Sequence, residues 1–120
     1  MAKTILVVED DADILAVLIS SLEGEGYAVV GAGDGRQALE WARSVPVDLI
    51  LLDMMLPVMS GYDALAALKA NPVTAAIPVL GISAKAALED IELASDLGVD
   101  AYITKPFRIA QVLQMIEAYI

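Results

Sequence analysis

The chain contains no cysteine and no histidine. Without cysteine it can form neither a disulfide framework nor a thiolate site. Without histidine it lacks the commonest general base and the commonest transition-metal ligand, and it cannot carry a phosphohistidine. Chemistry on this chain therefore has to use carboxylates, hydroxyls and lysines, with or without a hard cation.

Positive charge is also scarce, because seven lysines and arginines stand against seventeen acidic residues and give a net charge of −10. These bases are scattered, whereas binding to a nucleic-acid backbone needs clustered positive charge. No apolar run approaches the roughly 20 residues that span a bilayer, and the N-terminus lacks a signal-peptide pattern. We therefore expect no direct nucleic-acid binding, no membrane association and a cytoplasmic location.

Apolar residues are plentiful, at 58% of a chain of 120 residues, and prolines number only 5. This composition favours a folded core over disorder, and the length suits one domain. Short apolar runs alternate with segments of helical periodicity, without a linker or an internal repeat. We predict one α/β domain over residues 1–120, with a parallel sheet and helices on both faces.

The bounds of the elements follow from this alternation and from capping residues. Strands are predicted over residues 4–8, 27–30, 48–52, 77–82 and 101–103. Helices are predicted from a cap at Asp11 or Asp13 to residue 24, from 34 to about 46, and over 60–71, 86–97 and 107–119. Ser60 and Asp63 resemble a capping box with Asp in place of Glu, and Gly98 is expected to end the fourth helix.

Charged and hydroxyl-bearing residues stand where the strands end. Glu9 and Asp10 follow the first strand, Asp53 the third, Ser83 ends the fourth and Lys105 follows the fifth. The carboxyl ends of parallel strands share one edge of a sheet, where ligands bind. Three neighbouring carboxylates repel one another, and Mg²⁺ relieves that repulsion while also binding phosphate oxygen. A carboxylate can itself accept a phosphoryl group, and a lysine and a hydroxyl can stabilise that group.

Four stretches together resemble the receiver domain of two-component response regulators, similar to the chemotaxis response regulator and other single-domain receivers. They lie in register on the five strand–helix units and span nearly the whole chain. The stretches are Ile5-Leu6-Val7-Val8-Glu9-Asp10-Asp11, Leu51-Leu52-Asp53-Met54-Met55-Leu56-Pro57 with Gly61, Ile82-Ser83-Ala84, and Tyr102-Ile103-Thr104-Lys105-Pro106-Phe107.

The resemblance implies a flavodoxin-like strand order, 2-1-3-4-5, and a role for each acidic residue. Asp53 would be the phosphoacceptor. Asp10, Asp53 and the backbone carbonyl of Met55 would bind Mg²⁺, with Glu9 contributing directly or through water.

The remaining positions would form the switch. Ser83 would hydrogen-bond the phosphoryl group and Lys105 would pair with it, while Tyr102 would change rotamer as Ser83 moves. The peptide bond between Lys105 and Pro106 would be cis.

The implied function is a phosphorylation-driven switch rather than an enzyme that turns over an external substrate. A sensor histidine kinase or a histidine phosphotransfer protein would donate the phosphoryl group. The surface formed by the fourth helix, fifth strand and fifth helix would then control a downstream target or a fused output domain. A phosphorylation-dependent homodimer stays open.

The chain departs from the common family pattern at Glu9 and Ser83. It also has Met55 and Lys85 at two positions whose residue type varies across the family. Glu9 stands in place of the more frequent Asp, and Ser83 in place of Thr; both keep the chemical group. Met55 and Lys85 occupy positions that influence how fast the acyl phosphate hydrolyses. Because Met55 cannot orient an attacking water by a side-chain hydrogen bond, we hypothesise slow hydrolysis.

The same residues also admit simpler interpretations. Taken singly, each residue fits a structural role, such as a capping acid, a solvated lysine, a loop hydroxyl or a core tyrosine; their coincidence at four strand ends favours the functional one. An aspartate-nucleophile phosphohydrolase would need a second acid where Met55 stands. An unphosphorylated receiver that serves only as an interaction module would not need the full acidic set with Ser83 and Lys105.

Overall fold

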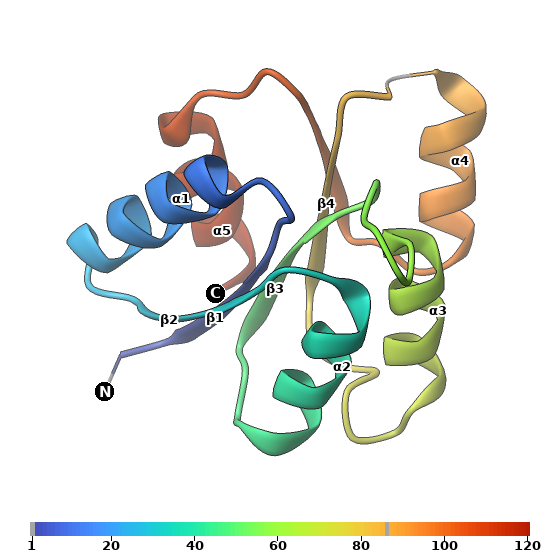
Figure 1. Cartoon of the computed structure of the whole chain (residues 1–120), viewed down its shortest axis with the longest axis horizontal. Coiled ribbons are helices and arrows are strands. Elements are labelled where there is room, and N and C mark those ends of the chain that lie inside the picture. The colour runs from blue at the N-terminus through green and yellow to red at the C-terminus, as the bar shows by residue number, and fades with distance from the viewer. Residues whose placement is uncertain (1, 86) are drawn as a thin grey trace.

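The computed structural model of the chain describes residues 2–85 and 87–120. Five parallel strands form one sheet in the order β2-β1-β3-β4-β5 (Figure 1). The strands are β1 (Thr4–Val8), β2 (Ala28–Ala32), β3 (Leu49–Asp53), β4 (Val79–Ser83) and β5 (Ala101–Thr104). The predicted parallel α/β architecture and its flavodoxin-like strand order are confirmed.

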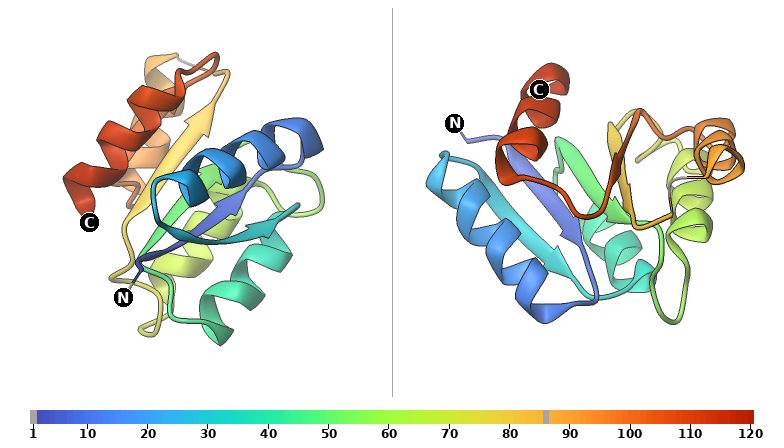
Figure 2. Two further views of the ribbon diagram at one scale, coloured as in Figure 1. Left: turned by 90° about the vertical axis from the view of Figure 1, so that its left-hand side faces the viewer. Right: turned by 90° about the horizontal axis from the view of Figure 1, so that it is seen from above.

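Helices cover both faces of the sheet (Figure 1, Figure 2). One face carries α1 (Ala12–Gly24) and α5 (Ile109–Tyr119); the other carries α2 (Gly35–Ser44), α3 (Gly61–Ala70) and α4 (Leu88–Asp96). Within residues 2–85 and 87–120, none of these helices combines the length and the apolar character that crossing a membrane requires.

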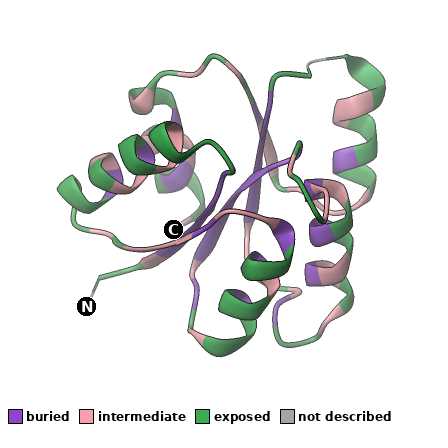
Figure 3. Cartoon of the chain, viewed as in Figure 1, coloured by how far each residue is buried: buried purple, intermediate pink, exposed green. Residues whose placement is uncertain are grey.

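The core is divided by the sheet into two clusters, because successive side chains of a strand point to opposite faces. In β1, Ile5 packs with α1 and α5, whereas Leu6 packs with α2 and α3. Every residue of β3 and β4 is buried, as Figure 3 shows. This explains why these strands are continuous apolar runs in the sequence rather than alternating ones. It also means that Asp53, the last residue of β3, is delivered into the interior.

Several predicted bounds shift by one or two residues. The second strand begins at Ala28, because the Tyr27 N–H still donates to Leu22 at the end of α1. The fourth begins at Val79, because Pro78 has no N–H to give to a strand ladder. Helix α5 begins at Ile109 rather than at residue 107. Helix α4 spans Leu88–Asp96, and the predicted start at residue 86 lies outside the described residues.

Side-chain and glycine caps define the ends of three helices. Asp11, not Asp13, caps α1, since its side chain accepts from the N–H groups of residues 13 and 14. The Ser60 hydroxyl accepts from the Asp63 N–H at 3.2 Å, which is one half of the predicted capping box. Gly98, which has φ +103°, follows α4 in the left-handed conformation that favours glycine.

The loop between β3 and α3 contains a strained residue. Val58 has φ +66°, the only positive value for a non-glycine residue in the described part of the chain. The Met59 N–H donates to the Pro57 carbonyl at 2.7 Å, so Val58 is the central residue of a γ-turn. A β-branched side chain is costly in this conformation, and Val58, being 85% exposed, gains little packing in return.

We therefore expect Val58→Asn to stabilise the protein. Asparagine tolerates positive φ, so the free energy of unfolding should rise by about 1 kcal/mol. Chemical denaturation measures this change. Val73→Asn is the matched control, because Val73 is also exposed but has no positive φ. Equal effects of the two substitutions would refute the assignment of strain to Val58.

Candidate functional site

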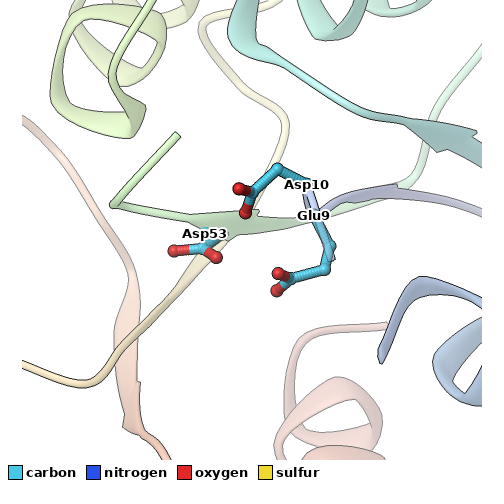
Figure 4. A group of neighbouring side chains, drawn as sticks. All are labelled: Glu9, Asp10 and Asp53. Atoms are coloured by element: carbon cyan, nitrogen blue, oxygen red, sulfur yellow. The ribbon is translucent and has the colours of Figure 1, made fainter. Parts of the chain in front are cut away.

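The carboxyl ends of β1 and β3 bring three acidic side chains together. Glu9, Asp10 and Asp53 each offer a carboxylate oxygen, and these oxygens lie within 4.8 Å of one another (Figure 4). Glu9 and Asp53 are each only 2% exposed, whereas Asp10 is exposed. Parallel pairing of β1 with β3 places the two strand ends side by side, as the sequence predicted.

Lys105 joins the two buried carboxylates. Its Nζ lies 2.9 Å from Asp53 Oδ2, 3.1 Å from Glu9 Oε2 and 3.4 Å from Glu9 Oε1. The lysine follows β5, and its backbone N–H donates to the Ser83 carbonyl at 2.8 Å. The peptide bond after Lys105 is cis, as the sequence resemblance implied. One cation thus spans the ends of β1, β3 and β5.

Backbone N–H groups orient the same carboxylates. The Met55 N–H donates to Asp53 Oδ1 at 2.9 Å, and the Asp11 N–H donates to Glu9 Oε1 at 3.2 Å. Asp53 therefore has Lys105 on one oxygen and a backbone N–H on the other. A buried charge needs such partners, because without them the desolvation cost is not offset.

Gly61 allows α3 to approach Asp53 closely. A Cβ at this position would lie 2.3 Å from the Asp53 carbonyl oxygen and 2.4 Å from Met54 Cα, so a side chain cannot be accommodated without moving the backbone. The Gly61 N–H donates to the Met54 carbonyl at 3.1 Å. Glycine is required here by close approach, and this contact fixes the backbone that carries Asp53.

The electrostatics of the cluster are unbalanced. Burial raises the pKa of Glu9 to about 7, with the charge of Asp53 adding to the effect; Asp11 and Lys105 act in the opposite direction. Burial disfavours the ammonium of Lys105, but its hydrogen bonds to Asp53 and Glu9 outweigh this and raise its pKa. With all groups ionised, three carboxylates face one ammonium, so the site has an excess of negative charge.

This donor set fits a hard divalent cation. Carboxylate oxygens from a partly open cluster are the ligands that Mg²⁺ prefers, and the excess negative charge would be neutralised by one such ion. Glu9, Asp10 and Asp53 would hold it. The backbone carbonyl of Met55, also expected as a ligand, stays a prediction.

Ser83 and Tyr102 are linked through the backbone of Lys85. The Lys85 N–H donates to Ser83 Oγ at 3.1 Å, and the Tyr102 hydroxyl donates to the Lys85 carbonyl at 2.8 Å. Ser83 is fully buried at the end of β4, one residue beyond Ile82, which pairs with Asp53 of β3. The predicted switch residues are therefore connected in this structure by one peptide segment.

Sequence reasoning named Lys85 and Gly61 but missed the physical role that each has at this site. Lys85 acts through its main chain, which its side-chain type does not reveal. Gly61 was recognised only as part of a resemblance, whereas its close approach to Asp53 is a physical requirement. Predicted residues Glu9, Asp53 and Lys105 are in direct contact, Asp10 lies beside them, and Ser83 and Tyr102 form the adjoining chain.

Comparison with known proteins is consistent with this geometry. The family model described as response regulator receiver domain matches residues 5–117. The chain is 39% identical over 118 residues to the DNA-binding response regulator MtrA of Mycolicibacterium paratuberculosis, covering 98% of this chain and 51% of that protein. It is 40% identical over 116 residues to the probable transcriptional regulatory protein TcrX of Mycobacterium tuberculosis, covering 96% and 48%. The chain thus spans about half the length of these curated relatives.

Solved structures show the same fold. The chemotaxis protein CheY4 of Vibrio cholerae superimposes with a TM-score of 0.95 at 26% identity, covering 100% of both chains. The receiver domain of a sensor histidine kinase from Pseudomonas aeruginosa superimposes with a TM-score of 0.91 at 31% identity, covering 99% of this chain and 98% of that one. The latter structure has a magnesium ion coordinated in its active-site cleft.

The raised pKa of Glu9 predicts that the stability of the metal-free protein depends on pH. Its pKa rises from 4.5 to about 7 on folding, so the folded protein binds more protons between these values. The free energy of unfolding should therefore fall as pH rises through this window. Glu9→Gln removes the titrating group. The difference in free energy of unfolding between Glu9→Gln and wild type should therefore be roughly 2 kcal/mol more favourable to the variant at pH 8 than at pH 5.

Urea denaturation in the presence of a chelator measures both proteins at the two pH values. Glu25→Gln, at an exposed glutamate, is the control. If Glu9→Gln changes the free energy of unfolding by the same amount at both pH values, Glu9 does not titrate in this window.

Proposed function

Since the chain belongs to the family of response regulator receiver domains, we propose that it is a phosphorylation-driven signalling switch with Asp53 as the phosphoacceptor. The observation that carries this proposal is the contact between buried Asp53 and Lys105 at 2.9 Å, within a cluster that retains excess negative charge. We propose further that residues 1–120 form one receiver domain.

The reaction proposed is transfer of a phosphoryl group from a phosphohistidine to Asp53. A carboxylate oxygen of Asp53 forms a bond to phosphorus as the P–N bond breaks, and the bonding electron pair stays on the imidazole nitrogen of the donor. The chain has no histidine, so the donor must be another protein or domain. A sensor histidine kinase or a histidine phosphotransfer protein supplies this chemistry.

The chain's own residues prepare Asp53 for the reaction. The Met55 N–H orients one carboxylate oxygen, and Lys105 lies where it can pair with the incoming phosphoryl oxygens. An open hollow of about 440 Å³ adjoins Lys105 and is lined also by Ile14, Ala84, Pro106 and Phe107. Asp10, Asp53 and the Met55 carbonyl would hold Mg²⁺, with Glu9 contributing directly or through water, and the bound ion would neutralise part of the phosphoryl charge.

The proposed output runs through Ser83 and Tyr102. A phosphoryl group on Asp53 adds negative charge and acceptor oxygens, which attract the Ser83 hydroxyl and Lys105. Movement of Ser83 changes its hydrogen bond with the Lys85 N–H, and the Lys85 carbonyl is the acceptor for Tyr102. This movement changes the conformation of the surface formed by α4, β5 and α5. A local change of charge at Asp53 thus has an effect at a distance.

The proposed partners follow from this role. The phosphorylated surface would control a downstream target or a fused output domain; two relatives of about twice this length are named as DNA-binding or transcriptional regulators. The chain itself has a net charge of −10, which supports output through protein contacts rather than direct nucleic-acid binding. We propose a cytoplasmic location, no membrane association and no turnover beyond self-phosphorylation and slow dephosphorylation.

Slow dephosphorylation is proposed because Met55, beside Asp53, is apolar and 48% exposed. Its side chain cannot hydrogen-bond an attacking water. Met55→Asn should therefore shorten the lifetime of phospho-Asp53, whereas Met55→Ala, which also lacks a polar group, should not. A comparable shortening by Met55→Ala would argue against this explanation.

The switch is tested by incubating the protein with Mg²⁺ and acetyl phosphate. Intact-protein mass spectrometry should show the gain of one phosphoryl group in wild type and none in Asp53→Asn. Lys105→Met should slow the gain by about tenfold or more, since charge-assisted stabilisation of the transferring group is lost. Unmodified wild-type protein, or equal phosphorylation of Asp53→Asn, would sink the proposal.

A further inference from the structure

The oxidisable sulfur of this chain lies entirely in methionine, because cysteine is absent. Of the five methionines, Met1 lies outside the described residues. Met54 is fully buried, and Met59 and Met115 are partly buried against the two core clusters. Met55 is 48% exposed, which makes its thioether the most accessible one in the described part of the chain. An oxidant in solution should therefore reach Met55 before the other three.

The backbone places this exposed thioether beside Asp53. The Met55 N–H donates to Asp53 Oδ1 at 2.9 Å, and the Met55 side chain branches from the next backbone atom. The preceding side chain, that of Met54, packs into the core cluster with α2 and α3. The thioether of Met55 thus lies within one side-chain length of the Asp53 carboxylate and is open to solvent.

Hydrogen peroxide converts such a thioether into a sulfoxide. The sulfur lone pair attacks one peroxide oxygen, an S–O bond forms as the O–O bond breaks, and the second oxygen leaves as water. Sulfur is oxidised by two electrons and the peroxide is reduced by two. The product has almost the same length as methionine but carries an oxygen that accepts hydrogen bonds, so a polar group replaces an apolar one beside Asp53.

We propose that Met55 is a site of reversible oxidation by peroxide, and that its sulfoxide shortens the lifetime of phospho-Asp53. This inference rests on the proposed function, in which Asp53 is the phosphoacceptor and water hydrolyses the acyl phosphate. A thioether is only a weak acceptor, whereas the sulfoxide oxygen can accept a hydrogen bond from the attacking water and orient it. Because one hydrogen bond contributes a modest free energy, we expect the lifetime to fall about threefold or more.

Reversal of this modification needs a reductant from outside the chain. Reduction of the sulfoxide consumes two electrons and two protons and releases the oxygen as water. The chain has no cysteine and hence no thiol for this step, so the electrons must come from a thiol-dependent methionine sulfoxide reductase. Peroxide would thus shorten the signal, and the reductase would restore its ordinary duration.

The test combines mass spectrometry with measurement of phosphoryl lifetimes. Wild type, Met55→Leu and Met115→Leu are treated with hydrogen peroxide, and peptide mass spectrometry locates the added oxygen. Each protein, before and after treatment, is then phosphorylated with acetyl phosphate and Mg²⁺ and desalted, and intact mass follows the loss of the phosphoryl group. Met115→Leu is the matched control, because it removes a partly buried methionine of α5.

We expect oxygen to be added to Met55 before Met59 and Met115. Peroxide should shorten the lifetime of the phosphorylated form about threefold or more in wild type and in Met115→Leu, and leave it unchanged in Met55→Leu. Methionine sulfoxide reductase with dithiothreitol should restore the original lifetime.

Two kinds of failure can be told apart. Slower oxidation of Met55 than of Met59 or Met115 overturns the inference alone, and so does an unchanged or longer lifetime once Met55 carries oxygen. Equal shortening in Met55→Leu also overturns it, because the effect would then come from damage elsewhere. Wild-type protein that acetyl phosphate does not modify, even without peroxide, overturns the proposed function itself.

Discussion

The contact of Lys105 with both Glu9 and Asp53 is the interaction on which the site depends. Two carboxylates that are each 2% exposed have lost most of their hydration, and a nearby cation offsets part of that cost. The parallel sheet supplies that cation from β5, two strands away from the carboxylate of β3, and the close approach of Gly61 fixes the backbone under Asp53. Neutralisation is incomplete, because the cluster has three acids and one lysine. Lys105 therefore offsets part of the repulsion between the carboxylates, and the remaining negative charge favours binding of a further cation.

The same arrangement explains how a charge added at Asp53 can reach the surface. After β4, the backbone of Lys85 forms two hydrogen bonds. Its N–H donates to the Ser83 hydroxyl, and its carbonyl accepts from the Tyr102 hydroxyl. A shift of this peptide changes both partners at once.

Much of the fold and of the site could be predicted from the sequence. An apolar run that ends in acidic residues indicates a buried strand and also places those acids at the carboxyl edge of the sheet. The parallel sheet and the acidic cluster at its edge agree with those predictions, and the strand order agrees with what the family resemblance implied. The start of β2 was missed because Tyr27 still serves the end of α1 through its backbone, which no side-chain pattern reveals. The link through Lys85 and the strain at Val58 both depend on the path of the backbone, which no side-chain pattern reveals.

The central claim, that Lys105 holds two buried carboxylates in one coupled cluster, is tested most directly by NMR titration of side-chain carboxyl carbons in metal-free protein. In wild type, Glu9 should titrate near pH 7, and in Lys105→Met its pKa should move higher, because the ammonium that favours the ionised form is gone. Lys69→Met is the control, since Lys69 pairs with Asp100 instead. Titration of Glu9 near 4.5 in wild type, unchanged by Lys105→Met, would contradict the account.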